Sequence, residues 1–233
     1  MDRCLLLFIK TFHNTFHSIF YLAAIPGFIG VLLLIALVKE KPKEPLPISA
    51  SLSKINNFNF SFKFFTLISC IFAIGNSFIA FLILRAQNLG LSTIQIILVY
   101  VTFNVTYALF STPAGIISDS IGKKKVVLLG FFLFSLVYLL FGFVQQKAFL
   151  WLLFPIYGVF MALTDGVGKA YISELVPQKN LGAAYGIYQT TTGICTFFAS
   201  LIAGLLWYHI NVQVPFLFGG IVGLVAGIMF LLM

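Results

Sequence analysis

Charged residues are scarce in this sequence. Only 9% of its 233 residues are Asp, Glu, Lys or Arg, whereas a soluble domain carries about 25%. Hydrophobic residues make up 61% of the chain, and its mean hydropathy is +1.07. So few charges cannot keep that much apolar surface in water, so the composition excludes a cytosolic enzyme, a disordered tail and a nucleic-acid-binding domain. A protein that crosses a membrane several times remains.

Cysteine clusters and catalytic motifs are also missing. Three cysteines without a C-x-x-C pair predict neither a disulfide framework nor a zinc site. The segment around Asp165 is not a phosphate loop, because that motif needs Gly at Leu163 and Ser or Thr at Ala170. His13 and His17 have no carboxylate or cysteine beside them. We therefore predict no catalytic residues, no metal site, no cofactor and no enzyme activity.

Seven apolar stretches are long enough to cross a bilayer, which takes about 20 helical residues. They are His17–Val38, Phe64–Leu84, Ile94–Ser118, Val126–Gln146, Ala148–Ile172, Ala183–Tyr208 and Val214–Met233. Helices are expected because lipid satisfies no backbone polar group, and the alternating segments of a barrel are absent. The predicted fold class is an all-α membrane protein, a polytopic bundle of about seven helices.

A polar, proline-rich stretch separates the first span from the others. Residues 39–63 read KEKPKEPLPISASLSKINNFNFSFK, which is linker composition. We therefore predict a short N-terminal segment and one transmembrane helix at 1–38, a cytoplasmic central linker at 39–63, and a six-helix bundle at 64–233.

Basic residues are unevenly distributed between the loops. If the first span runs from outside to inside, the inner segments hold nine of them: Lys39, Lys41, Lys43, Lys54, Lys63, Lys123, Lys124, Lys125 and Lys179. The outer segments hold four: Arg3, Lys10, Arg85 and Lys147. By the positive-inside rule we expect the C-terminus to face the cytoplasm. We expect the protein to cross the inner (cytoplasmic) membrane of the cell several times. The net charge of +8 then reports orientation and not a nucleic-acid partner.

Small and basic residues suggest further packing and anchoring. Glycines at a spacing of four predict close helix approach in the last two spans, at Gly182, Gly186, Gly219, Gly223 and Gly227. Arg85 ends the second span, and we predict that it anchors that end at the membrane interface.

The loop between the third and fourth spans holds the most informative segment, GIISDSIGKKK, which begins at Gly115. Asp119 lies one turn later at a helix C-terminus, where the macrodipole disfavours a carboxylate, so it needs a compensating partner. Gly122 permits a tight turn, and Lys123 and Lys124 face the inner surface. From the residues alone, a basic inner loop with an incidental Asp explains the segment equally well.

This segment resembles the loop signature of the major facilitator superfamily, G-x-x-x-D-[RK]-x-G-[RK]-[RK]. The matching residues are Gly115, Asp119, Gly122, Lys123 and Lys124. Ser120 departs from the usual basic residue, and the lysines that follow Gly122 would supply the missing charge.

Three further stretches are similar to a bacterial branch of the same superfamily. FYLAAIPGFIGVLLLIALVKEKP looks like its sixth span and NSFIAFLILRAQNLGLS like its seventh. TDGVGKAYISELVPQKNLGAAYGIYQTTTGICTFFASLIAGLLW looks like its tenth and eleventh, with Leu181 where an Arg is common. The resemblance implies twelve spans in two six-helix halves, each a pair of three-helix inverted repeats. This chain matches the sixth span plus the C-terminal half.

Asp165 and Lys169 are the only charged residues inside a predicted span, and their spacing suits an i,i+4 ion pair. Two interpretations stay open: a structural pair that closes the inner end of the bundle, or a site of proton coupling or substrate contact. In the resembled family the first and fourth helices of each half line the cavity, which implies Asn76 and Asp165. Asn104 and Gln189 are further candidates. Any single uncharged candidate would equally serve as an interhelical hydrogen bond.

The implied function is a component of a secondary transporter that moves a small solute by alternating access. The partners would be that solute, the lipid bilayer, and either a missing N-terminal half or a second copy. One half cannot enclose a two-sided cavity, so we expect a fragment of a longer reading frame in preference to a split subunit or a homodimer. The alternative is a non-transporting scaffold or assembly protein derived from a transporter half, which the departures at Ser120 and Leu181 favour.

Overall fold

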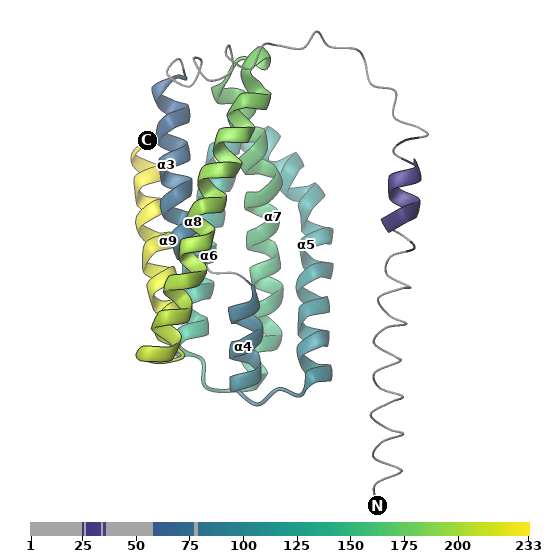
Figure 1. The fold of residues 1–233 in the computed structure, drawn as a ribbon, viewed down its shortest axis with the longest axis vertical. Helices are drawn as coiled ribbons and strands as arrows, with labels where there is room; N and C mark the ends of the chain where they lie inside the picture. The colour runs from purple at the N-terminus through teal and green to yellow at the C-terminus, as the bar shows by residue number, and fades with distance from the viewer. Residues whose placement is uncertain (1–24, 26, 34, 36–57, 77–78) are drawn as a thin grey trace, which may run out of the picture. The chain divides into compact units, whose positions relative to one another are not determined.

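The computed structural model describes residues 25, 27–33, 35, 58–76 and 79–233 (Figure 1). The chain divides into two compact units, Met1–Ile48 and Ser49–Met233. In the first unit the described residues are helical. The rest of the predicted span His17–Val38 lies outside the described residues, as do the N-terminal segment and most of the predicted linker.

The described part of the second unit consists of helices and their connections, without a strand. The helices are α3 (Phe60–Gly75), α4 (Ala80–Asn88), α5 (Thr93–Ile121), α6 (Lys123–Phe143), α7 (Leu150–Leu175), α8 (Leu181–His209) and α9 (Val214–Leu232), with 3-10 turns η2 (Lys147–Phe149) and η3 (Gln178–Asn180). Among the residues that the structure describes, six segments are long and apolar enough to cross a membrane, with α3 and α4 counted together. The predicted polytopic helical bundle is confirmed, and α5 to α9 match predicted spans to within a few residues.

Local chemistry sets several of the helix ends. The hydroxyl of Ser92 accepts a hydrogen bond from the amide of Gln95, whose side chain accepts one from the Ser92 amide, so a capping box begins α5. Gly122 separates α5 from α6 with a φ of +99°, a conformation that side-chain-bearing residues rarely adopt. Pro215 occupies the first turn of α9, where its missing N–H has no cost.

The second predicted span, Phe64–Leu84, lies within a segment long and apolar enough to cross a membrane, Phe60–Asn88, but the helix in it is interrupted. The first piece, α3, begins at Phe60 and ends at Gly75, and α4 begins at Ala80. Asn76 has φ −88° and ψ 80°, which is outside the helical region. Asparagine favours such positions because its side chain replaces helical hydrogen bonds. A single Asn hardly lowers the hydropathy of an apolar run, so the pattern did not reveal the break.

The helix packing repeats within the bundle. Helix α5 packs against α7 as α8 packs against α3, and α6 packs against α7 as α9 packs against α3. Helices α6 and α9 pack against each other. Exchanging the first three spans with the last three maps these pairs onto one another, as a three-plus-three repeat requires. The alternating directions bring the start of α3, the α5–α6 turn, the α7–α8 connection and the C-terminus to one end (Figure 1).

Two helix contacts depend on the absence of a side chain. A Cβ placed on Gly158 of α7 would lie 2.6 Å from the carbonyl oxygen of Phe103 on α5. A Cβ on Gly219 of α9 would overlap the carbonyl oxygen of Gly75 on α3. Both obstacles are backbone atoms, which cannot rotate away as a side chain can, so glycine sets these helix distances.

The remaining predicted packing glycines divide by helix. Gly223 and Gly227 face α6. An added Cβ on Gly223 would lie 2.6 Å from the Phe134 ring, and one on Gly227 would lie 3.3 Å from the Phe132 ring, so the prediction for α9 is confirmed. At Gly182 and Gly186 of α8 an added Cβ meets no described atom within 4 Å. The prediction of close packing at these two is therefore wrong within the described part of the chain.

Arg85 is buried within the bundle, where it bonds to another helix, and its predicted role as an anchor at the membrane interface stays a prediction. Its side chain is only 4% exposed. Nε donates to the carbonyl of Phe141 at 3.2 Å, Nη2 to that of Val144 at 2.7 Å, and Nη1 to Oδ1 of Asn88 at 3.0 Å. The two carbonyls lie at the C-terminus of α6, where backbone oxygens lack helical partners and carry partial negative charge. Arg85 thus ties α4 to the end of α6.

Replacing Arg85 with methionine is expected to destabilise the bundle, because the carbonyls of Phe141 and Val144 lose their donors. Hydrogen bonds to charged groups contribute about 1.5–3 kcal/mol each. The measurement is the midpoint of thermal unfolding in detergent, which should fall for Arg85→Met. Lys147 is an exposed basic residue at the same end of the bundle, so Lys147→Met is the matched control and should keep the wild-type midpoint. Equal midpoints for all three proteins would contradict the structural role of Arg85.

Candidate functional site

A pocket of about 560 Å³ lies between α3, α5, α6, α7 and α8. Its wall includes all the residues that the sequence singled out as substrate or coupling candidates. They are Asn76 at the end of α3, Asn104 on α5, Asp165 and Lys169 on α7, and Gln189 on α8. The structure therefore brings positions from four helices to one space, while their roles remain predictions.

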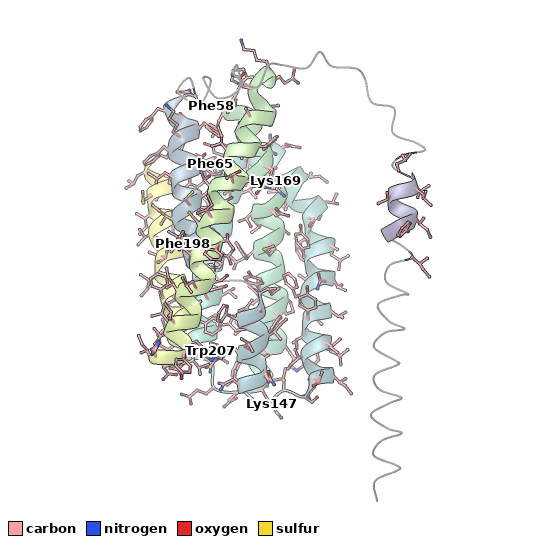
Figure 2. All side chains as sticks on the ribbon, viewed as in Figure 1. Phe58, Phe65, Lys147, Lys169, Phe198 and Trp207 are labelled. Carbon is pink, nitrogen blue, oxygen red and sulfur yellow. The ribbon has the colours of Figure 1, made fainter. Side chains whose placement is uncertain are left out.

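Asp165 and Lys169 form the predicted i,i+4 ion pair, with 2.8 Å between Lys169 Nζ and Asp165 Oδ1. The hydroxyl of Tyr107 on α5 donates to the other carboxylate oxygen at 2.9 Å. The Asp165 side chain is 40% exposed and that of Lys169 46%, so the pair is accessible from the pocket. Figure 2 shows Lys169 toward the end of the bundle that carries Phe58, opposite Lys147. This geometry fits both interpretations of the pair.

Asn76 is fixed at the break between α3 and α4. Its Oδ1 accepts hydrogen bonds from the hydroxyls of Tyr138 at 3.4 Å and Tyr157 at 3.3 Å. Both tyrosines engage the oxygen, and the Nδ2 amide donors of Asn76 have no acceptor among the described residues, so they can bind an acceptor in the pocket. The interruption of the span thus presents a polar group deep among aromatic rings.

Asn104 and Gln189 lie on the more exposed helices of the pocket wall. Nδ2 of Asn104 donates to the carbonyl of Tyr100 on its own helix at 2.8 Å. On α8, the hydroxyls of Thr192 and Thr196 donate to the carbonyls one turn earlier, so only their oxygen lone pairs face other groups. The α5 and α8 walls are consequently polar but uncharged.

Three tyrosines of this site were missed by the sequence reasoning. Tyr107, Tyr138 and Tyr157 donate hydrogen bonds to the candidate residues, but they lie in apolar runs that predict only core packing. A usable signal was available, because a phenol inside a membrane span needs a partner for its hydroxyl.

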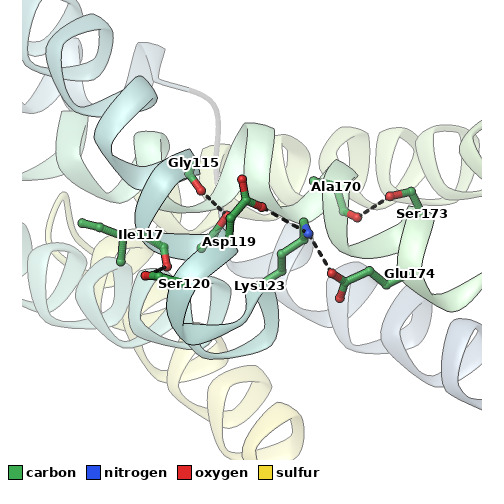
Figure 3. Close-up of polar contacts among 9 residues, drawn as sticks. Gly115, Ile117, Asp119, Ser120, Lys123, Ala170, Ser173 and Glu174 are labelled. Atoms are coloured by element: carbon green, nitrogen blue, oxygen red, sulfur yellow. Dashed lines mark hydrogen bonds and ion pairs between the residues drawn. The ribbon is translucent and has the colours of Figure 1, made fainter.

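Charged residues of the loop signature form a cluster with a carboxylate of α7 (Figure 3). Nζ of Lys123 lies 3.4 Å from Oδ1 of Asp119 and 2.7 Å from Oε1 of Glu174, near the end of α7. The Asp119 side chain is 74% exposed and that of Lys123 only 19%. Lys123 therefore bridges a carboxylate on α5 and one on α7, while Ser120 bonds the carbonyl of Ile117.

Comparison with known proteins identifies the family of the chain. Residues 64–233 match the sequence profile described as Major Facilitator Superfamily. The chain belongs to the Major Facilitator Superfamily. It is similar to MJ1317, an uncharacterized MFS-type transporter of Methanocaldococcus jannaschii, at 37% identity over 233 residues, covering 97% of this chain and 58% of that protein.

Two more superfamily relatives match shorter stretches. MJ1560, an uncharacterized MFS-type transporter of the same organism, is 28% identical over 156 residues, which are 66% of this chain and 40% of that protein. YybF, an uncharacterized MFS-type transporter of Bacillus subtilis, is 27% identical over 116 residues, 50% of this chain and 29% of its own length. The chain thus spans little more than half the length of MJ1317 and less of the other two. It is a multi-pass membrane protein of this superfamily.

A smaller pocket of about 240 Å³ lies beside the superfamily loop signature and shares two lining residues with the larger pocket. Tyr107 and Asp165 line both pockets, and Asp119 and Lys123 line the smaller one. The α5–α7 contact is therefore the place where the loop signature and the pocket candidates meet.

Reversing the charge at position 123 is expected to weaken the loop cluster. Lys123→Glu would bring a third carboxylate to Asp119 and Glu174, and we expect a loss of about 1 kcal/mol, as for other exposed charge pairs. Adding Glu174→Lys should recover part of that loss, because it restores one attraction. Thermal midpoints of the two single variants and the double variant give the coupling. Additive effects of the two changes would show that the bridge contributes nothing, and Lys125→Glu on the same turn is the control.

Proposed function

We propose that the chain forms one half of a secondary active transporter, which moves a small solute across the membrane by alternating access without chemically changing it. The observation that carries this proposal is the pocket, because its polar groups come from several helices of a superfamily bundle. It supports the substrate-contact interpretation of Asn76, Asp165, Lys169 and Gln189. Proton coupling through Asp165 is part of the proposal.

The exposed faces of α5 and α8 support a second half. These two helices line the pocket, yet they are the least buried spans in the described bundle. The surface they expose includes large apolar residues, among them Leu109 and Phe198. We propose that a missing N-terminal half of a longer polypeptide covers this face, with a second copy of the chain as the alternative arrangement.

The proposed orientation follows from the charges at the bundle ends. The end that carries Lys123, Lys124, Lys125 and Lys179 is more basic than the end that carries Lys147. We propose that the protein lies in the inner membrane and that its more basic end faces the cytoplasm. There the Asp119–Lys123 cluster would pair with the other half in one state and release it in the next.

Proteoliposomes test the proposed function. The protein is expressed from its native reading frame and reconstituted around a trapped pH-sensitive dye, and a panel of solutes is added across an imposed pH gradient. We expect at least one solute to exchange and to change the proton flux, whereas residues 1–233 alone should move none. A folded protein that moves no solute in either direction would support the scaffold alternative, and transport by residues 1–233 as a cross-linkable dimer would support the second copy.

A further inference from the structure

One part of the larger pocket is aromatic. The ring of Phe72 on α3 stacks on that of Phe131 on α6 with 4.0 Å between centroids, and Phe160 on α7 lies 5.9 Å from Phe72. Together with Phe103 on α5 these buried rings line the pocket. Aromatic pairs stabilise contacts by about 0.5–1.5 kcal/mol beyond the area they bury. This part suits a planar or branched apolar group.

The charged side chains that this chain contributes to the pocket wall have a net charge of zero. Among the described lining residues one is acidic, Asp165, and one is basic, Lys169. Against the part of the wall that this chain supplies, a solute with a single net charge would leave an uncompensated charge, which is costly. A solute with one positive and one negative group leaves the total unchanged, since its ammonium can take the place of Lys169 and its carboxylate that of Asp165.

The same pocket wall carries hydrogen-bonding groups besides this ion pair. The Asp165 and Lys169 side chains are half-exposed toward the pocket, so a ligand reaches both. The amide donors of Asn76 suit a carboxylate or carbonyl oxygen, and the hydroxyl oxygens of Thr192 and Thr196 suit an ammonium. The wall therefore offers both donors and acceptors next to an apolar surface.

We infer that the pocket binds an amphipathic zwitterion of the amino-acid type, with an aromatic or branched apolar side chain. Its two charged groups exchange partners with the Asp165–Lys169 pair, and its side chain packs on the phenylalanine rings. A volume of about 560 Å³ falls in the range of small-molecule sites, about 300–1,000 Å³. The inference rests on the proposed transport function and names the substrate class for the same site.

Four probes separate the features of such a ligand. L-phenylalanine carries both charges and a ring, phenethylamine lacks the carboxylate, 3-phenylpropionate lacks the ammonium, and glycine lacks the ring. Calorimetry on the purified protein, expressed from its native reading frame, gives the affinities. We expect L-phenylalanine to bind at least about tenfold more tightly than each of the others, where tenfold corresponds to 1.4 kcal/mol.

A double variant tests whether the ion pair carries this preference. Asp165→Asn with Lys169→Gln removes both charges and leaves the net charge of the wall unchanged. We expect the advantage of L-phenylalanine over phenethylamine to disappear in this variant. It should persist in the control Lys147→Gln, which changes an exposed lysine at the opposite end of the bundle.

The outcomes distinguish the substrate class from the transport function. Tighter binding of phenethylamine or phenylpropionate would overturn the zwitterion in favour of a singly charged solute. The absence of binding by all four, in a protein that exchanges another solute in liposomes, would also overturn the inference but leave the transport proposal standing. Absence of any solute exchange would instead remove the proposed function itself.

Discussion

Replacing Gly219 with leucine is expected to abolish the folded bundle. Even a Cβ at this position overlaps the carbonyl oxygen of Gly75, and the Tyr138 ring lies 2.8 Å from it. Overpacking costs about 1–3 kcal/mol where neighbours can shift, and here the first obstacle is backbone. Separating α3 from α9 would also displace Tyr138, which holds Asn76. A single defect would therefore damage both the packing and the pocket.

Size-exclusion chromatography and thermal unfolding in detergent measure this effect. Gly219→Leu should give aggregated protein or a midpoint far below the wild type, with Gly219→Ala between the two. Gly186→Leu on α8 is the matched control, because an added Cβ there meets no described atom within 4 Å. A monodisperse Gly219→Leu protein with a wild-type midpoint would show that α3 and α9 can separate without loss of the fold.

Asp165→Asn is expected to have the largest effect on transport. The change removes the negative charge that Lys169 and Tyr107 both contact, at 2.8 and 2.9 Å. A hydrogen bond to a charged group contributes about 1.5–3 kcal/mol, and a loss of 1.4 kcal/mol corresponds to about a tenfold lower rate. We therefore expect initial rates in liposomes to fall at least about tenfold and their dependence on the pH gradient to disappear. Asp165→Glu, which keeps the charge, should retain that dependence.

The neutral double variant separates a structural role of the pair from a coupling role. Removing one partner of a partly buried pair leaves an uncompensated charge, whereas removing both is often nearly neutral for stability. If the pair is only structural, Asp165→Asn with Lys169→Gln should recover transport together with stability. If Asp165 couples protons, the double variant should recover stability while its transport stays independent of the pH gradient.

The membrane topology could be predicted because lipid imposes one simple rule. Each span must be long, apolar and helical, so the six described spans appear directly in the hydropathy of the sequence. The break at Asn76 could not be predicted in this way, nor could the hydrogen bonds that Tyr138 and Tyr157 from two other helices make to its side chain. Hydropathy averages over a window and does not register a single residue that changes its backbone.

The candidate site was predictable to a similar extent. Charges inside a span are rare enough that Asp165 and Lys169 stand out in the sequence, and their spacing already indicates a pair. Arg85 is also charged, but it lies at the end of a predicted span, where a basic residue is typical of an anchor at the membrane interface. Its burial follows from the carbonyls of Phe141 and Val144, which only the folded α6 presents. Residues whose partners lie on other helices were the ones that the sequence left open.

The two helical pieces of the interrupted span are attached to different helices. The first piece, α3, packs closely on α9 where Gly75 meets Gly219. The second piece, α4, is attached to α6 by the hydrogen bonds of Arg85. Because the two attachments reach different neighbours, the loss of one would leave the other piece of the span attached. Asn76 ends the first piece and lines the pocket, so the attachment of α3 sets the position of a pocket residue.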